Sequence, residues 1–278
     1  MRNSRLNNAI LFFLICIALS GCGDWYVTNE YRSPVWKDSG TIYCVEYEYK
    51  ERYPILWPFS PWDQEYSRYL SSMDIEGNNY SRIILLSDED TDEDRISVSS
   101  NVFVYERSGE VWTIMIDGSN NKKIVSGSFP RISPNGTKVV YQSSSDEVWI
   151  INIDGTEAKK LWDNSKNFSC AWSTDTTRVA VGTDDGIRIV NINDLESTLL
   201  PVEYMEYIDW SSDGAEFVYW NPGLMIMDIN GNSVKIFGQV FRNPKWSPDN
   251  QKIVGEQNGI AIINRDGTNF KTIKGDVL

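Results

Sequence analysis

The sequence predicts an all-β protein, a six-bladed β-propeller of four-stranded antiparallel blades, and three observations support this prediction. A serine that opens a turn recurs every 36 to 40 residues, at Ser97, Ser133, Ser173, Ser211 and Ser247. An apolar run that closes in a second turn follows each serine, as at Asp154-Gly155 and Asp266-Gly267. Short β-branched and aromatic runs such as Val148 to Ile151 lie between these marks. Two independent marks with one period indicate a structural repeat.

Each repeat has the composition of a small antiparallel sheet. Glycine and asparagine in both turns tolerate positive φ at little cost, and the runs between the turns are apolar enough to be covered on both faces. One such sheet cannot bury its faces alone, so the sheets are expected to stack into a closed ring. An earlier pair of turns, near Asp38-Ser39-Gly40 and Asp74 to Gly77, gives a longer first unit and brings the count to six.

Two further features of the interior follow from this arrangement. The tryptophan or isoleucine before each turn serine is predicted to pack between neighbouring blades. Cys44 and Cys170 fall in blades one and four, too far apart for a disulfide, so we expect two buried free thiols. Trp25 to Thr28 are expected to add an outer strand to the last blade and so to close the ring.

The repeat also resembles a known family. Trp246-Ser247-Pro248-Asp249, with the Asp-Gly turn that follows, is similar to the repeats of the TolB periplasmic propeller and of propellers in prolyl-oligopeptidase-like enzymes, over about residues 30–275. The resemblance implies the fold. It does not select a function, because propellers serve as scaffolds, receptors and enzymes.

The N-terminus has the features of an export signal. Arg2 and Arg5 precede an apolar run of 11 residues from Ala9 to Leu19, too short to span a bilayer. The run ends in Leu19-Ser20-Gly21-Cys22, which resembles the lipobox of bacterial lipoproteins. This resemblance implies lipidation of Cys22, although ordinary cleavage with Cys22 as a bystander is an alternative.

The expected organisation is therefore a signal peptide over residues 1–21, a lipid-anchored linker over 22–30 and the propeller over 31–278. Cys22 would hold the protein on a membrane of the bacterial envelope. Gly23 follows the cysteine where an aspartate retains such lipoproteins in the inner membrane of Gram-negative cells, so the resemblance favours the outer membrane. The sequence does not indicate an oligomeric state.

Composition excludes several functions. The net charge of −13 disfavours nucleic acid as a partner. The absence of histidine removes Ser-His-acid triads, Cys-His pairs and imidazole-ligated metals, so we expect neither a catalytic site of these kinds nor a metal or cofactor. Chemistry based on carboxylates stays open. The alternative function is thus a carbohydrate-active enzyme using funnel carboxylates, with Asp146-Glu147 and Asp184-Asp185 as acids to consider.

Two insertions supply the candidate partner surface. The first is predicted as a long loop from Lys50 to Arg68. It carries the aromatic residues Tyr53, Trp57, Phe59, Trp62 and Tyr66. Long loops in compact domains tend to be functional, and aromatic residues suit protein contact or sugar stacking. The same loop can equally fold back and cap a blade, and both interpretations stay open.

The second insertion is an acidic crossover from blade one to blade two. Its candidate residues are Asp88, Asp90, Asp92 and Asp94. The segment fails as a calcium loop because Glu93 stands where glycine is required, and a solvated charge run is the default interpretation. Both insertions are expected on the same face of the ring. The leading hypothesis is therefore an envelope-anchored binding or scaffold lipoprotein that contacts a protein or a glycan.

Overall fold

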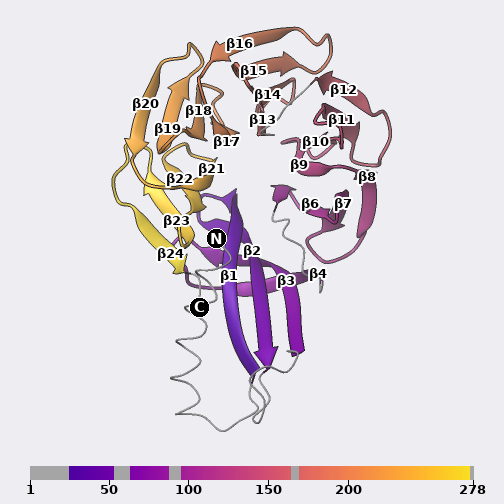
Figure 1. Cartoon of the computed structure of the whole chain (residues 1–278), viewed down its shortest axis with the longest axis vertical. Helices are drawn as coiled ribbons and strands as arrows, with labels where there is room; N and C mark the ends of the chain where they lie inside the picture. The colour runs from indigo at the N-terminus through magenta and orange to yellow at the C-terminus, as the bar shows by residue number, and fades with distance from the viewer. Residues whose placement is uncertain (1–24, 53–62, 88–94, 164–168, 276–278) are drawn as a thin grey trace.

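The computed structural model is a ring of six antiparallel sheets (Figure 1). It describes residues 25–52, 63–87, 95–163 and 169–275. Each sheet consists of four strands that are consecutive in the chain, so the prediction of an all-β protein with six four-stranded blades is confirmed. Over the ranges just given, no helix is long and apolar enough to cross a membrane.

The strands follow the chain from blade to blade. Blade one contains β1 (Trp25–Asp38), β2 (Thr41–Arg52), β3 (Asp63–Asp74) and β4 (Ser81–Ser87). Blade two contains β5 (Ile96–Ser99), β6 (Val102–Arg107), β7 (Glu110–Met115) and β8 (Lys122–Ser126). Blade three contains β9 (Ser128–Ile132), β10 (Lys138–Gln142), β11 (Val148–Asn152) and β12 (Lys159–Trp162).

The second half of the ring repeats this order. Blade four contains β13 (Cys170–Trp172), β14 (Arg178–Thr183), β15 (Gly186–Asn191) and β16 (Ser197–Pro201). Blade five contains β17 (Glu206–Trp210), β18 (Glu216–Trp220), β19 (Leu224–Asp228) and β20 (Ser233–Phe237). Blade six contains β21 (Arg242–Trp246), β22 (Lys252–Glu256), β23 (Gly259–Asn264) and β24 (Lys271–Gly275).

The serine of the repeat turn is a buried hydrogen-bonding centre. In blade four, Ser173 Oγ donates to Asp175 Oδ1 over 2.6 Å and accepts the N–H of Arg178 over 2.9 Å. Asp175 Oδ1 also accepts the N–H of Thr177 over 3.0 Å. Blades five and six repeat this arrangement around Ser211 and Ser247. One serine and one acid therefore close the turn in blades four, five and six, which explains the period of the sequence mark there.

Blade two corrects the predicted register of the turn. Ser97 lies inside β5, where its Oγ accepts the N–H of Ile132 over 3.1 Å, and the turn is formed by Ser100 and Asn101 instead. Ser99 and Val102 pair directly across a two-residue loop, whereas the equivalent turns of blades three to six are longer. Blade four departs differently: Leu195 adopts a φ of 66° in its outer turn, where other blades use glycine.

The core lies between the blades rather than within them. Each of the six clusters of buried apolar residues draws its members from two neighbouring blades. Trp172, Trp210 and Trp246 each belong to the cluster that joins their own blade to the preceding one, which confirms the predicted packing role. Cys44 and Cys170 are both buried and free, as predicted.

Blade six packs directly on blade one, and we call this contact the closing interface. Trp36 Nε1 donates to the carbonyl of Lys245 over 3.0 Å, and the N–H of Ser33 donates to Glu256 Oε1 over 2.7 Å. Lys271 Nζ forms an ion pair with Glu76 Oε2 at 2.6 Å. The ring therefore closes by packing and side-chain contacts.

The prediction that Trp25 to Thr28 join the last blade is wrong, because these residues pair with the end of β2 in blade one, from Tyr49 to Arg52. Thr28 lies opposite Tyr49, and Trp25 lies opposite Arg52. Strand β1 thus begins inside the segment 22–30 that the sequence analysis assigns to a linker. The repeat pattern starts only near Val35, so it does not predict that β1 of blade one begins as early as Trp25.

Blade one is much longer than the other blades. β1 has 14 residues and β2 and β3 have 12 each, whereas no other strand of the described chain exceeds 7 residues. A register shift between Arg32 and Val35, with Ser33 at a φ of 51°, divides β1 into two parts. Such a bulge bends a strand. The part after the bulge follows the repeat, and the part before it joins β2 and β3 in a ribbon that projects beyond the ring (Figure 1).

The turn aspartates predict how stability depends on pH. The hydrogen bond from Ser173, with the N–H of Thr177, lowers the pKa of Asp175 from 3.8 to about 2. The equivalent serines lower the pKa of Asp213 and Asp249. A carboxyl with a lowered folded-state pKa adds stability above its unfolded pKa and loses it as pH falls through the folded pKa. We therefore expect the free energy of unfolding to fall between about pH 4 and pH 2.

Asp175→Asn provides the control for this prediction. Blade three already has Asn135 at the equivalent position, and its Oδ1 accepts from Ser133 Oγ over 2.7 Å. The variant keeps the acceptor and removes the titration, so urea denaturation should show a shallower pH dependence than the wild type. Equal slopes between pH 4 and pH 2 would contradict the assignment.

Candidate functional site

The structure describes one of the five predicted aromatic residues of the first insertion. Tyr66 lies in β3, not in a loop, because β2 continues to Arg52 and β3 begins at Asp63. The predicted loop from Lys50 to Arg68 is therefore wrong at both ends. The other four aromatic candidates lie outside the described residues; they are Tyr53, Trp57, Phe59 and Trp62.

The acidic crossover and the lipidation site also lie outside the described residues. The candidates concerned are Cys22, Asp88, Asp90, Asp92 and Asp94. Residues 88–94 connect β4 to β5, and residues 53–62 connect β2 to β3. Because β2 and β4 run in the same direction in one antiparallel sheet, both connections leave blade one from the same end of that sheet.

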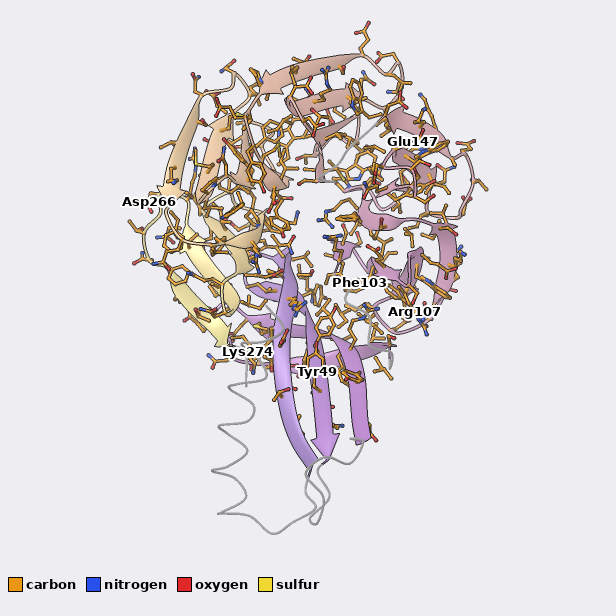
Figure 2. All side chains as sticks on the ribbon, in the orientation of Figure 1. Tyr49, Phe103, Arg107, Glu147, Asp266 and Lys274 are labelled. Carbon is orange, nitrogen blue, oxygen red and sulfur yellow. The ribbon has the colours of Figure 1, made fainter. Side chains whose placement is uncertain are left out.

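Tyr66 belongs to a cluster of tyrosines on one face of the ribbon. The rings of Tyr49 and Tyr66 lie directly across from each other on β2 and β3 in an edge-to-face arrangement, with centroids 5.5 Å apart. Tyr47 stacks beside Tyr49 at 6.3 Å. We call Tyr47, Tyr49 and Tyr66 the tyrosine face. Figure 2 shows Tyr49 on the ribbon, away from the central gap.

The tyrosine face has one residue in the core and two at a half-exposed surface. Tyr47 is buried in the cluster between blades one and two, and Tyr49 packs against the same cluster. Tyr49 and Tyr66 are half-buried. The guanidinium of Arg32 lies 5.3 Å from the centroid of Tyr47. Such a surface offers apolar area together with phenol hydroxyls, which suits contact with another macromolecule.

The sequence contained a signal for the two tyrosines that the prediction missed. Residues 45–50 alternate between apolar or aromatic and charged side chains, with Tyr47 and Tyr49 between Glu46, Glu48 and Lys50. This alternation is typical of a strand with two different faces. It predicts that β2 continues through residue 50 and places both tyrosines on one face.

The opposite face of blade one holds a network of buried charges, which we call the Glu46 network. Arg82 donates to both oxygens of Glu46, from Nε over 2.7 Å and from Nη2 over 2.8 Å, and to Glu48 Oε2 over 2.5 Å. Tyr80 donates its hydroxyl to Glu46, and Ser71 Oγ donates to Glu46 Oε2 over 3.3 Å. Glu46 is only 1% exposed.

The pKa directions follow from this pairing. Burial alone would raise the pKa of Glu48, but the hydrogen bonds from Arg82 and Lys50 outweigh it and lower that pKa. The hydrogen bond to Glu46 raises the pKa of Arg82. Burial, followed by Glu46, raises the pKa of Tyr80. Glu48 therefore stays ionised and the phenol of Tyr80 stays protonated, as in a structural ion-pair network.

The network also reaches blade six. The ammonium of Lys274 lies 4.3 Å from the ring centroid of Tyr80 and 5.1 Å from that of Tyr31. Burial, followed by the charge of Glu46, raises the pKa of Tyr31 to about 12. The base of the ribbon is thus fixed to the closing interface by both charge and aromatic contact.

Three of the acids considered for catalysis are engaged with other side chains of their own blades. Glu147 Oε2 accepts from Trp149 Nε1 over 2.9 Å, and its Oε1 pairs with Lys160 of the outermost strand β12 at 3.2 Å. Figure 2 shows Glu147 on the outer part of blade three. Asp146 Oδ1 accepts from Gln142 Nε2 over 3.0 Å, and Asp185 pairs with Arg188 at 2.8 Å.

Three carboxylates bind the backbone of the next blade. Glu106 accepts the N–H of Phe129 over 2.8 Å, and Asp209 accepts the N–H of Trp246 over 2.9 Å. Glu256 accepts that of Ser33 across the closing interface. These acids join consecutive blades around the axis. In the part of the chain that the structure describes, no group of three or more acids and cysteines could hold a metal ion.

Comparisons with known proteins establish the fold. No family model matches the chain, and no curated protein matches it either. A structure from Agrobacterium tumefaciens assigned as TolB is 15% identical, with a TM-score of 0.58, and the match covers 71% of this chain and 84% of that one. An oligogalacturonate lyase solved with manganese is 12% identical, with a TM-score of 0.51, over 86% of this chain and 94% of that one.

A second oligogalacturonate lyase, from Vibrio parahaemolyticus, is 12% identical, with a TM-score of 0.49, over 87% of this chain and 97% of that one. The similar structures thus include both a TolB and a lyase. The six blades of four antiparallel strands seen here agree with the likeness to TolB that the repeat indicated. The chain is a six-bladed β-propeller similar in fold to TolB.

Proposed function

We propose that the protein is an envelope-anchored binding lipoprotein, held on the membrane through Cys22, which recognises a protein partner with the blade-one ribbon. The observation that supports this proposal is the extension of one blade only. β1, β2 and β3 extend beyond the ring, although a propeller blade needs no such length to bury its faces. A rigid ring with one projecting ribbon suits presentation of a contact surface rather than catalysis.

The edge of the ribbon favours a polypeptide over a glycan. β1 is the edge strand of its sheet, with β2 as its only neighbour in that sheet. Before the bulge at Ser33, this edge leaves the ring, and Val27 is 44% exposed. Exposed edge strands are a common route for adding an extended segment of a partner, and the tyrosine face beside the edge adds contact area.

The test is photocrosslinking in cells with a photoreactive residue in place of Val27. Val234 serves as the control position, because it is 58% exposed on the outer strand of blade five. We expect a discrete crosslinked protein from position 27 and none from position 234. The double variant Tyr49→Ser/Tyr66→Ser should reduce that product strongly, whereas Tyr204→Ser, in the exposed connection between blades four and five, should leave it unchanged.

Three outcomes would contradict parts of this proposal. Equal crosslinking from both positions would remove the ribbon as a specific surface. Crosslinking to a glycan would contradict a protein partner and would support the glycan alternative. The anchor is tested separately: incorporation of labelled palmitate should disappear in Cys22→Ser, and its persistence there would contradict lipidation of this residue.

A further inference from the structure

A pocket at the ring axis has a charge opposite to that of the protein. It is small and partly open to solvent. Residues from blades one, two, three and six line it, and its charged lining residues are Arg95, Arg131 and Lys245. The chain as a whole carries a net charge of −13. Figure 2 shows side chains with nitrogen ends projecting into the central gap. Three cations therefore converge on one point of an acidic protein.

The repeat itself brings these cations together. Arg131 and Lys245 occupy the same position in their blades, immediately before the apolar residue that packs between blades. Asp209 holds this position in blade five, and its Oδ1 pairs with Lys245 Nζ at 3.0 Å. Residues at equivalent positions of a ring face the axis at one level. Asp209 offsets one positive charge of this group.

Arg131 lacks a partner for a buried donor. Its Nη1 donates to the carbonyl of Pro130 over 3.2 Å, but its Nε is buried without a hydrogen bond. Arg131 forms no ion pair with any residue that the structure describes. Buried donors are normally satisfied, and a guanidinium presents a planar fork that matches an oxyanion.

The other groups around the pocket are held in place. The guanidinium of Arg95 lies 3.3 Å from the ring centroid of Phe129. Asn243 Nδ2 donates to Glu256 Oε1 over 2.7 Å, so this nearby carboxylate is already engaged. Burial lowers the pKa of Lys245; Asp209 opposes this shift and Arg131 adds to it. A bound anion would relieve the repulsion between Lys245 and Arg131.

We propose that this axial pocket binds a small free oxyanion, an inorganic phosphate or an organic carboxylate, through Arg131, Lys245 and Arg95. The pocket is small, so it limits the ligand to a small anion. Charge-assisted hydrogen bonds to the guanidinium groups would provide the binding energy. This site is independent of the ribbon and of any partner that the ribbon binds.

The test is isothermal titration of the full chain with inorganic phosphate, with citrate and with chloride at constant ionic strength. We expect saturable binding of phosphate, of citrate or of both, and no comparable binding of chloride. Binding of phosphate alone or of citrate alone would show whether the pocket takes an inorganic phosphate or an organic carboxylate. Absence of saturable binding by both would overturn the proposal.

Matched variants separate a specific site from general attraction. Arg131→Gln should weaken oxyanion binding by about tenfold or more, because a hydrogen bond to a charged group is lost. Arg95→Gln gives a second variant in case Arg131→Gln unfolds. Arg107→Gln removes the same charge on the outer part of blade two (Figure 2) and should bind as the wild type does. Equal weakening in Arg107→Gln and Arg131→Gln would overturn the proposal.

Discussion

Arg82→Met is expected to lower the free energy of unfolding by about 3 kcal/mol, because it leaves Glu46 buried without its main partner. Glu46 is 1% exposed and accepts two hydrogen bonds from Arg82. Breaking a buried ion pair by removing one member costs about 3 to 5 kcal/mol. The lower end of this range applies, since the side chain of Arg82 is itself 33% exposed and partly screened.

Two further variants test the cause of that loss. Arg82→Met/Glu46→Gln removes the orphaned charge, so urea denaturation should show the double variant to be more stable than Arg82→Met alone. Arg265→Met breaks an ion pair with Glu216 in which the arginine is 50% exposed, and should cost less than about 1 kcal/mol. If the Arg82 and Arg265 variants lose the same stability, Glu46 is not held as the structure indicates.

The repeat was predictable because a serine and a nearby acid or amide close the same turn in blades three to six. Ser173 and Asp175 close a turn through contacts within a few residues, so the period of the sequence reports the period of the structure. Blade two shows the limit of this logic. Ser97 fits the period, but its hydroxyl accepts a hydrogen bond from the next blade, and the turn lies at Ser100 and Asn101.

The ribbon was missed because two sequence signals disagreed. The prolines and tryptophans after residue 52 favour a loop, whereas the alternation around Tyr47 and Tyr49 favours a strand, and only the first signal entered the prediction. The Glu46 network could not be predicted. Arg82 lies 36 residues from Glu46, and only the register of β2, β3 and β4 brings the two side chains together.

The axial cations could be predicted from the sequence in part. Arg131 and Lys245 are far apart in the chain, but each directly precedes the apolar packing residue of its repeat. An alignment of the repeats therefore places both on the axis. The alignment does not predict that Arg131 Nε is buried without a hydrogen bond, because this depends on the side chains that surround it in the ring.

Gly77→Ala is expected to destabilise the protein by about 2 to 4 kcal/mol through the closing interface. Gly77 lies in the outer turn of blade one with a φ of 80°, and a Cβ there would lie 1.9 Å from the carbonyl oxygen of Ile273 in blade six. Positive φ costs about 1 kcal/mol for alanine, and overpacking adds about 1 to 3 kcal/mol. A backbone oxygen in a paired strand cannot move aside as a side chain would.

Gly118→Ala is the matched control, because Gly118 occupies the same turn of blade two at a φ of 82°, with nothing within 4 Å of the added methyl group. It should cost only the backbone term of about 1 kcal/mol. Gly267→Ala should resemble Gly77→Ala, since its Cβ would lie 2.2 Å from the carbonyl oxygen of Ile236 in blade five. Chemical denaturation of the three variants therefore measures the contact between blades separately from the turn. If Gly77→Ala lost no more stability than Gly118→Ala, blades six and one would not be packed as closely as the structure shows, and the ring would have to close in another way.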